Sequence, residues 1–242
     1  LREIFGTSSI KNYNGTSYVE FTPNTFDNLK ALPENVRANN FCVNSHNYAP
    51  NYDKPFYKTD ADTEDKPLYM GCEIELNGGG KNAVNASLLL GALGDFKDVG
   101  YVMHDGSLTD GVELATHPAT LSAHKDPNIM NYDRLFTLAR ALGYDAHESG
   151  NAGLHVHVSR NFFTYPEVAL HIMSTFVHNN WDSLLVFTRR MKTNHYAAPC
   201  KNSTRSNGKV KGLRDLIRNL DIEGTIKSHD NNGKYASINT QH

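Results

Sequence analysis

The clearest pattern in the chain is a strict alternation of apolar and polar residues that begins near Tyr69. Within Tyr69–Asn77 every second side chain is apolar and those between include two glutamates, which predicts a half-buried strand. Gly111–His117 and Gly153–Ser159 alternate in the same way, and Asp98–His104 has the length and composition of a strand. These four segments predict strands of a sheet that has one apolar and one polar face.

Segments with the apolar spacing of helices lie between and after these strands. They are Asn85–Leu93, Tyr132–Leu142, Pro166 to about Asn179, Trp181–Arg190 and Leu213–Leu220. Thr164 and Glu167 have the spacing of a capping box for the long helix, and Tyr235–Thr240 begins a last strand. Strands in hairpin pairs with helices between them predict an α+β fold with an antiparallel sheet.

Residues 1–66 have a different composition from the rest of the chain. Asn, Tyr, Pro, Thr and Asp are interleaved there, and apolar residues occur singly without a helical or strand period. We interpret 1–66 as an extended N-terminal arm or linker and 67–242 as the catalytic-type domain. Arms of this kind commonly lie on a neighbour, so a protein partner is expected to bind through residues 1–66.

Composition excludes several classes of protein. The 242 residues are 39% hydrophobic and 21% charged with a net charge of −2, which excludes a wholly disordered chain and gives no basic excess for nucleic acid. No apolar run approaches the roughly 20 residues of a membrane helix, and no signal peptide is recognised at the N-terminus. Three cysteines at unrelated spacings favour a reducing compartment, so a cytoplasmic location is expected.

Glutamates and histidines occupy polar positions of the predicted strands. Glu73 and Glu75 are two residues apart, so on a strand they share a face at roughly 6–7 Å. His155 and His157 repeat this geometry, and Glu113 is the polar position of a third strand. Each feature alone is more typical of a solvated face or an incidental pair. Together, on one sheet, they would line one face with metal-ligand side chains.

The type of ligand predicts the type of metal. Carboxylates dominate and no cysteine takes part, which favours Mg²⁺ or Mn²⁺ over structural Zn²⁺. Carboxylate-rich magnesium sites commonly serve phosphoryl transfer, which also needs cations for the phosphates. Arg189 and Arg190 are candidates, although such a pair also complements a helix C-terminus. Gly78–Lys81 is interpreted as a turn, with backbone contact to a phosphate as the alternative.

Five short motifs follow one another over residues 68–242. They are Met70–Asn77 (MGCEIELN), His104–Pro118 (HDGSLTDGVELATHP), Gly153–Ser159 (GLHVHVS), Arg189 and Arg190 with Tyr196, and Tyr235–Asn239 (YASIN). In this order they resemble the amidoligase family of phages, bacteria and fungi, which belongs with glutamine synthetase and glutamate–cysteine ligase to the carboxylate–amine ligase superfamily. The resemblance does not cover the arm.

The resemblance implies a fold, cofactors and a reaction. The fold is a curved antiparallel sheet around the active site with helices on its outer face, as in glutamine synthetase. The cofactors are ATP and Mg²⁺. A carboxylate attacks the γ-phosphate of ATP, and an amine then displaces phosphate from the acyl phosphate to give an amide or isopeptide bond. The partners are therefore a carboxylate and an amine, from a peptide or a small molecule.

Residue roles also follow from the resemblance. The positions that match the family's metal ligands are Glu73, Glu75, Glu113 and His155. His155 is also expected near nucleotide phosphate, and His157 is expected to orient the acceptor or the transferred phosphate. Arg190 is the expected phosphate-contacting arginine, with Arg189 as the alternative.

Further positions in the motifs have weaker implications. Asp105 and Ser107 are expected to shape a turn or touch substrate, and Asn239 to be a polar site residue. The family continues into a strand with a Glu-x-Arg pattern, whereas this sequence ends at His242. We therefore expect the sequence to be part of a longer chain whose domain lacks its last strand here.

Two other functions are compatible with the same residues. The first is a structural or interaction subunit of a larger assembly such as a phage virion, which retains the ligase fold and is held by its arm. The second is a metal hydrolase that uses His155, His157 and a carboxylate on a zinc-bound water. The hydrolase predicts one tetrahedral metal and no nucleotide affinity.

Overall fold

The computed structural model describes residues 10–13, 16–19, 43–50, 53–95, 97–146, 149–189, 204–206 and 209–211. The chain forms two compact units, Leu1–Phe162 and Phe163–His242. The division into an arm and a catalytic domain stays a prediction, and the boundary between the compact units lies at a different position.

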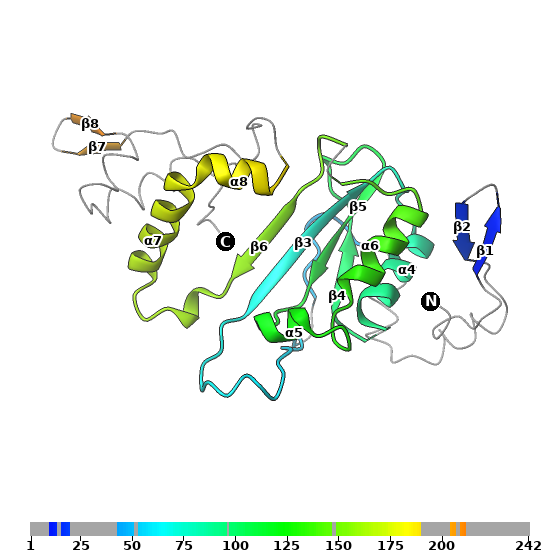
Figure 1. Cartoon of the computed structure of the whole chain (residues 1–242), viewed down its shortest axis with the longest axis horizontal. Helices are drawn as coiled ribbons and strands as arrows, with labels where there is room; N and C mark the ends of the chain where they lie inside the picture. The colour runs from blue at the N-terminus through cyan, green and yellow to red at the C-terminus, as the bar shows by residue number, and fades with distance from the viewer. Residues whose placement is uncertain are drawn as a thin grey trace. The chain divides into compact units, whose positions relative to one another are not determined.

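A four-stranded sheet is the centre of the first unit (Figure 1). Its order is β4 (Gly100–Met103), β5 (Gly111–Thr116), β3 (Met70–Asn77) and β6 (Leu154–Val158), and every neighbouring pair is antiparallel. The predicted α+β class with an antiparallel sheet is therefore confirmed. The position of β3 between β5 and β6 places its two glutamates beside polar residues on both neighbouring strands.

The register of the sheet brings acidic and histidine residues of different strands together. Glu75 of β3 pairs with Glu113 of β5, and Glu73 of β3 pairs with His155 of β6. Because side chains alternate along a strand, these four residues share one face, and Ile74 points to the other. A slip of one residue would move the whole set to the opposite face, so burial of the apolar positions sets this register.

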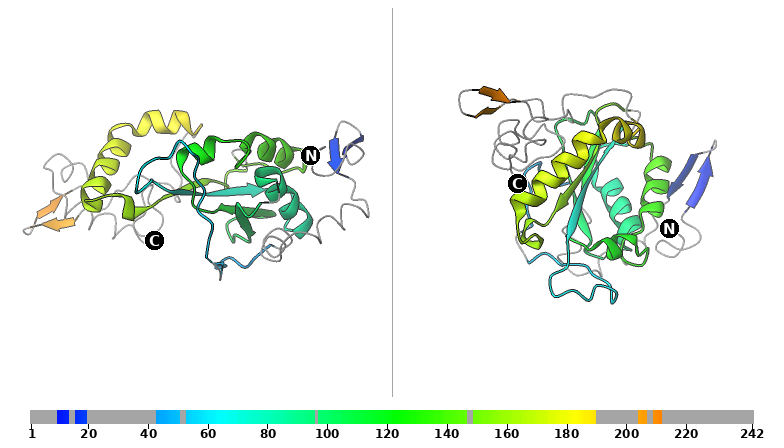
Figure 2. Two further views of the ribbon diagram at one scale, coloured as in Figure 1. Left: turned by 90° about the horizontal axis from the view of Figure 1, so that it is seen from below. Right: turned by 60° about the vertical axis from the view of Figure 1, so that its left-hand side comes forward.

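Two helices pack beside one another on the apolar face of the sheet (Figures 1 and 2). α4 (Ala83–Gly94) begins at Asn82, whose side chain accepts a hydrogen bond from the Asn85 N–H, and α6 (Tyr132–Ala141) begins at Asn131. The buried side chains shared by these helices and the sheet include Ile74, Leu76, Leu89, Leu90, Leu93, Val102, Val112, Leu114, Leu135 and Ala139. Burial of this apolar surface fixes the sheet that carries the polar face.

Residues 43–50 fall within the predicted arm, and one of them, Asn44, pairs with the sheet at its β4 edge. The Asn44 N–H donates to the Val102 carbonyl at 2.9 Å, and the His104 N–H donates to the Asn44 carbonyl at 2.9 Å. Residue 44 thus forms a parallel bridge to Met103 of β4. This part of the chain belongs structurally with the sheet. A role of residues 1–66 in binding a partner stays a prediction.

Tyr57 anchors a second part of this region. Its N–H donates to the Pro118 carbonyl at 3.0 Å, and its hydroxyl donates to the Asp98 carbonyl at 2.8 Å. Replacing Tyr57 by Phe keeps the ring and removes the hydroxyl bond, so we expect the free energy of unfolding to fall by about 1 kcal/mol. Tyr165→Phe is the matched control, because Tyr165 is 71% exposed. Equal urea midpoints for both variants would contradict this anchoring.

The second unit contains α7 (Pro166–Asn179) and α8 (Trp181–Phe187), at the positions predicted for the long helix and its continuation. The predicted capping box is wrong. Pro166 occupies the start of α7, so Tyr165 is the N-cap, and it makes no side-chain capping hydrogen bond. No described helix has the length and apolar character that a membrane span requires.

Several short elements complete the described part of the chain. They are β1 (Ile10–Tyr13), β2 (Thr16–Val19), α5 (Leu121–Lys125), the 3₁₀ turn Arg160–Phe162, β7 (Thr204–Ser206) and β8 (Lys209–Lys211). The predicted helix Leu213–Leu220 and strand Tyr235–Thr240 lie outside the described residues.

Candidate metal site

Five polar side chains share the face of the sheet opposite α4 and α6, as the alternation predicted. Glu75 and Glu113 are buried, at 8% and 6% exposure. Glu73 is partly buried, and the side chains of His155 and His157 are 57% and 47% exposed. The face therefore has a buried acidic centre on β3 and β5 and a more accessible histidine pair on β6.

Three carboxylates converge at the acidic centre. One ligand atom each of Glu75, Asp105 and Glu113 lies within 4.8 Å of the other two. Asp105 follows β4, and its Oδ1 accepts a hydrogen bond from the Ser107 N–H at 2.6 Å and another from the Ser107 hydroxyl. The two glutamates are thus held by the sheet and the aspartate by its own turn. We call these three residues the acidic cluster.

The electrostatics of the acidic cluster favour a bound cation. Burial, followed by the charges of Glu73, Asp105 and Glu75, raises the pKa of Glu113 from 4.5 to about 7. Burial also raises the pKa of Glu75. Carboxylates that are close and desolvated resist ionisation unless a cation offsets their charge. The cluster can therefore hold a metal ion, and its three oxygen donors suit Mg²⁺ or Mn²⁺.

Glu73 connects the two histidines of β6. Its Oε2 lies 3.1 Å from His155 Nδ1, and its Oε1 lies 3.0 Å from His157 Nε2. The hydrogen bonds from His155 and His157 hold the pKa of Glu73 well below its usual range. The bond to Glu73 is also the main cause that raises the pKa of each imidazole. Glu73 therefore favours the positively charged form of both histidines.

Glu73→Gln is expected to lower the pKa values of His155 and His157. The amide carries no charge and makes a weaker acceptor, so the protonated imidazoles lose their main stabilising partner. NMR titration of the imidazole protons measures this shift. Glu64→Gln, at an exposed carboxylate, is the control and should leave both histidines unchanged. Unchanged titration in Glu73→Gln would contradict the pairing.

The predicted metal ligands are brought to one face but form two groups. Glu75 and Glu113 belong to the acidic cluster, whereas Glu73 and His155 contact one another. His155 connects the groups, since its Nε2 lies 3.8 Å from Glu75 Oε1. Direct metal ligation by Glu73 and His155 stays a prediction.

Of the two candidate phosphate-contacting arginines and Asn239, the structure describes only Arg189. Arg189, just after α8 in the second unit, has a positive φ of 56°. Arg190 and Asn239 lie outside the described residues. Their proposed roles rest on the sequence.

The glycine-rich turn after β3 uses its backbone groups internally. The N–H groups of Gly78 and Gly80 both donate to the Asp110 carbonyl, at 2.8 and 3.1 Å. Both glycines have positive φ values, 92° and 95°, which other residues rarely adopt. This agrees with the interpretation of Gly78–Lys81 as a turn, because these two amides are engaged within the protein.

Asp105 is the member of the acidic cluster that sequence analysis did not assign to metal. Its bonds with Ser107 agree with the predicted turn role. Its position in the sequence carries a further signal. Met103 of β4 pairs with Glu113, and residue 105 is two positions further on, so an extended chain would place it on the same face as Glu113. That signal depends on the register between β4 and β5, which Asp98–His104 alone does not reveal.

The arrangement joins an oxygen-donor cluster to a histidine pair, which together suit the binding of a divalent cation beside an anionic ligand. Comparisons of the chain with family models, with curated proteins and with solved structures find no match.

Proposed function

We propose that this protein is an ATP- and Mg²⁺-dependent ligase that joins a carboxylate to an amine through an acyl phosphate. The observation that carries the proposal is the acidic cluster, in which Glu75, Asp105 and Glu113 approach within 4.8 Å. The amidoligase-like motifs support the same reaction. The antiparallel sheet with helices on one face agrees with the glutamine synthetase-like fold that these motifs imply.

The acidic cluster would hold the cation through carboxylate oxygens, the donors that Mg²⁺ prefers. Bound Mg²⁺ neutralises negative charge on the phosphates of ATP. The protein contributes positioning: Glu75 and Glu113 are opposite one another on paired strands, and Ser107 orients Asp105. Such a preformed site avoids the cost of reorganising charged groups during the reaction.

His155 and His157 would supply positive charge beside the cluster. Glu73 raises the pKa of both imidazoles, so a larger share of each is protonated near neutral pH. We assign His155 to nucleotide phosphate and His157 to orientation of the acceptor or of the transferred phosphate. Arg190, with Arg189 as the alternative, is proposed as a further phosphate contact.

The donor set favours this function over a zinc hydrolase. A hydrolase of that kind needs His155 and His157 on one metal, but neither histidine is among the residues whose ligand atoms converge within 4.8 Å in the described part of the chain. The three close ligand atoms are all carboxylate oxygens, and these suit Mg²⁺ better than Zn²⁺.

ATP turnover in the presence of hydroxylamine tests the proposal, because hydroxylamine converts acyl phosphates into hydroxamates. The full chain is incubated with ATP, Mg²⁺ and a panel of peptides and small carboxylic acids. We expect ADP and hydroxamate to form in equal amounts, and only with Mg²⁺. Absence of MgATP binding in calorimetry would contradict the proposal and would instead favour a structural subunit that retains the fold or the metal hydrolase.

A further inference from the structure

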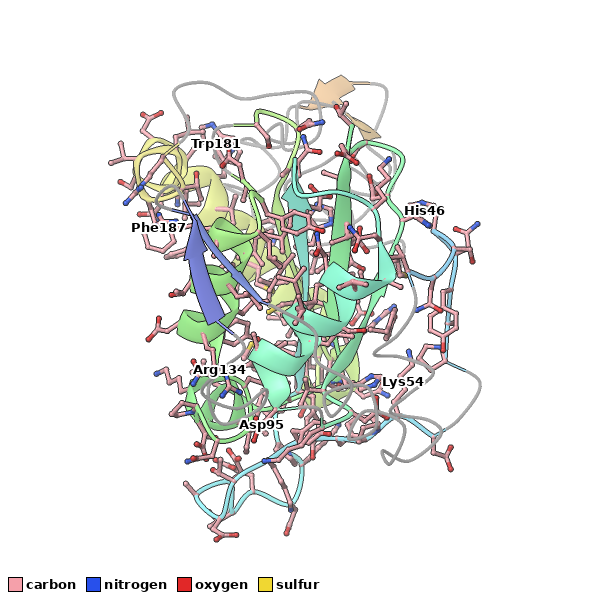
Figure 3. The ribbon with its side chains drawn as sticks, turned by 90° about the vertical axis from the view of Figure 1, so that its right-hand side faces the viewer. His46, Lys54, Asp95, Arg134, Trp181 and Phe187 are labelled. Carbon is pink, nitrogen blue, oxygen red and sulfur yellow. The ribbon has the colours of Figure 1, made fainter. Side chains whose placement is uncertain are left out.

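We propose that His46 is a positioning residue for the candidate metal site and acts through Asp105. The inference rests on the proposed metal-dependent function. His46 belongs to residues 43–50, which were predicted to be part of the N-terminal arm. The structure describes this segment at the edge of β4 (Figure 3).

The backbone on both sides of His46 is anchored. Asn44 pairs with β4 through two backbone hydrogen bonds of 2.9 Å, and the Tyr48 N–H donates to the Ser45 carbonyl at 3.0 Å. His46 is therefore the second residue of a hydrogen-bonded turn. The Tyr48 ring packs edge-to-face on Tyr101 of β4, with centroids 5.2 Å apart. These anchors hold His46 in place although its side chain is 57% exposed.

The imidazole of His46 faces the carboxylate of Asp105. Nδ1 of His46 lies 3.6 Å from Oδ2 of Asp105, whose side chain is only 13% exposed. The other oxygen, Oδ1, accepts both hydrogen bonds from Ser107. A carboxylate oxygen has two lone-pair sites, and the two bonds from Ser107 use both sites of Oδ1. Oδ2 is therefore the oxygen that retains a site for a cation. His46 on one side and Ser107 on the other thus restrict the orientation of Asp105.

His46 acts on the cation indirectly. The three ligand atoms that lie within 4.8 Å of one another come from Glu75, Asp105 and Glu113, and His46 is not among these residues. Mutation of a residue that orients a metal ligand, without binding the metal, typically lowers metal affinity by about 10–100-fold. His46 should affect Mg²⁺ and Mn²⁺ alike, because it adds no nitrogen donor that would favour the transition metal.

Metal titration of the full chain tests this role without requiring turnover. We expect His46→Ala to weaken Mn²⁺ binding in calorimetry by at least about 10-fold, and Mg²⁺ binding by the same factor. His46→Asn should largely restore both affinities, because the asparagine amide nitrogen lies near the position of imidazole Nδ1 and can donate to Asp105. His178→Ala, a histidine substitution on α7, is the matched control and should leave both affinities unchanged.

The outcomes separate this inference from the proposed function. If His46→Ala binds Mn²⁺ like the wild type while Glu75→Gln has lost binding, the positioning role is wrong and the metal site stands. If the wild type binds no Mn²⁺, both are wrong. A nitrogen hyperfine coupling of bound Mn²⁺ that disappears only in His46→Ala would make His46 a ligand and overturn the indirect role.

Discussion

Replacing Glu75 by Gln is expected to reduce Mg²⁺-dependent ATP turnover by at least about 100-fold, because loss of a metal-binding charge removes several kcal/mol of stabilisation and each 1.36 kcal/mol is tenfold in rate. Glu75 lies at the centre of the site, opposite Glu113 and 3.8 Å from His155 Nε2. Its amide counterpart keeps the shape and loses the charge. Steady-state ADP release, measured across a range of Mg²⁺ concentrations, gives the size of the loss.

His155→Ala should cause a comparable loss, since it removes the imidazole that lies near Glu73 and Glu75 and that we assign to nucleotide phosphate. Glu64→Gln, at an exposed carboxylate outside the acidic cluster, is the control for both variants and should retain full turnover. Circular dichroism should show the same fold for all three proteins. Wild-type turnover in both Glu75→Gln and His155→Ala would refute the site assignment.

Glu113→Gln is expected to stabilise the metal-free protein at pH 8, although it removes a proposed metal ligand. The pKa of Glu113 is raised from 4.5 to about 7, so the folded state binds this proton more tightly than the unfolded state. Below pH 4.5 the wild-type carboxyl is protonated in both states and does not change the free energy of unfolding. As the pH rises towards 7 its buried ionised form lowers the free energy of unfolding progressively, and above that pH the loss is complete. At 1.36 kcal/mol per unit, this loss is on the order of 1–3 kcal/mol. Gln is neutral at every pH and avoids it.

Urea denaturation in a chelator at pH 5 and pH 8 measures this effect. The stability gain of Glu113→Gln over the wild type should be clearly larger at pH 8 than at pH 5. Adding Mg²⁺ at pH 8 should stabilise the wild type and have little effect on the variant, because only the wild type retains the intact cluster. Glu64→Gln serves again as the control. A gain that is equal at both pH values would contradict the proposed burial of a charged carboxylate.

The sequence by itself determined the strands and the composition of the polar face. Strand alternation is a local property with a period of two, so Glu73 and Glu75 had to share a face once their apolar neighbours were buried. The same reasoning placed His155 with His157, and the helical spacing of Tyr132–Leu142 identified α6. These features follow from near neighbours along the chain, and burial of apolar side chains enforces them.

Only the tertiary structure decided which of these residues meet. Strand order and register place Glu75 opposite Glu113 and Glu73 opposite His155, and neither pairing can be read from one strand alone. Asp105 enters the cluster because β4 pairs with β5. His46 approaches Asp105 because residue 44 bonds to the edge of β4, across 58 positions of sequence. Such contacts depend on long-range backbone pairing, whose partners are distant in sequence and leave no periodic signal in the segment itself.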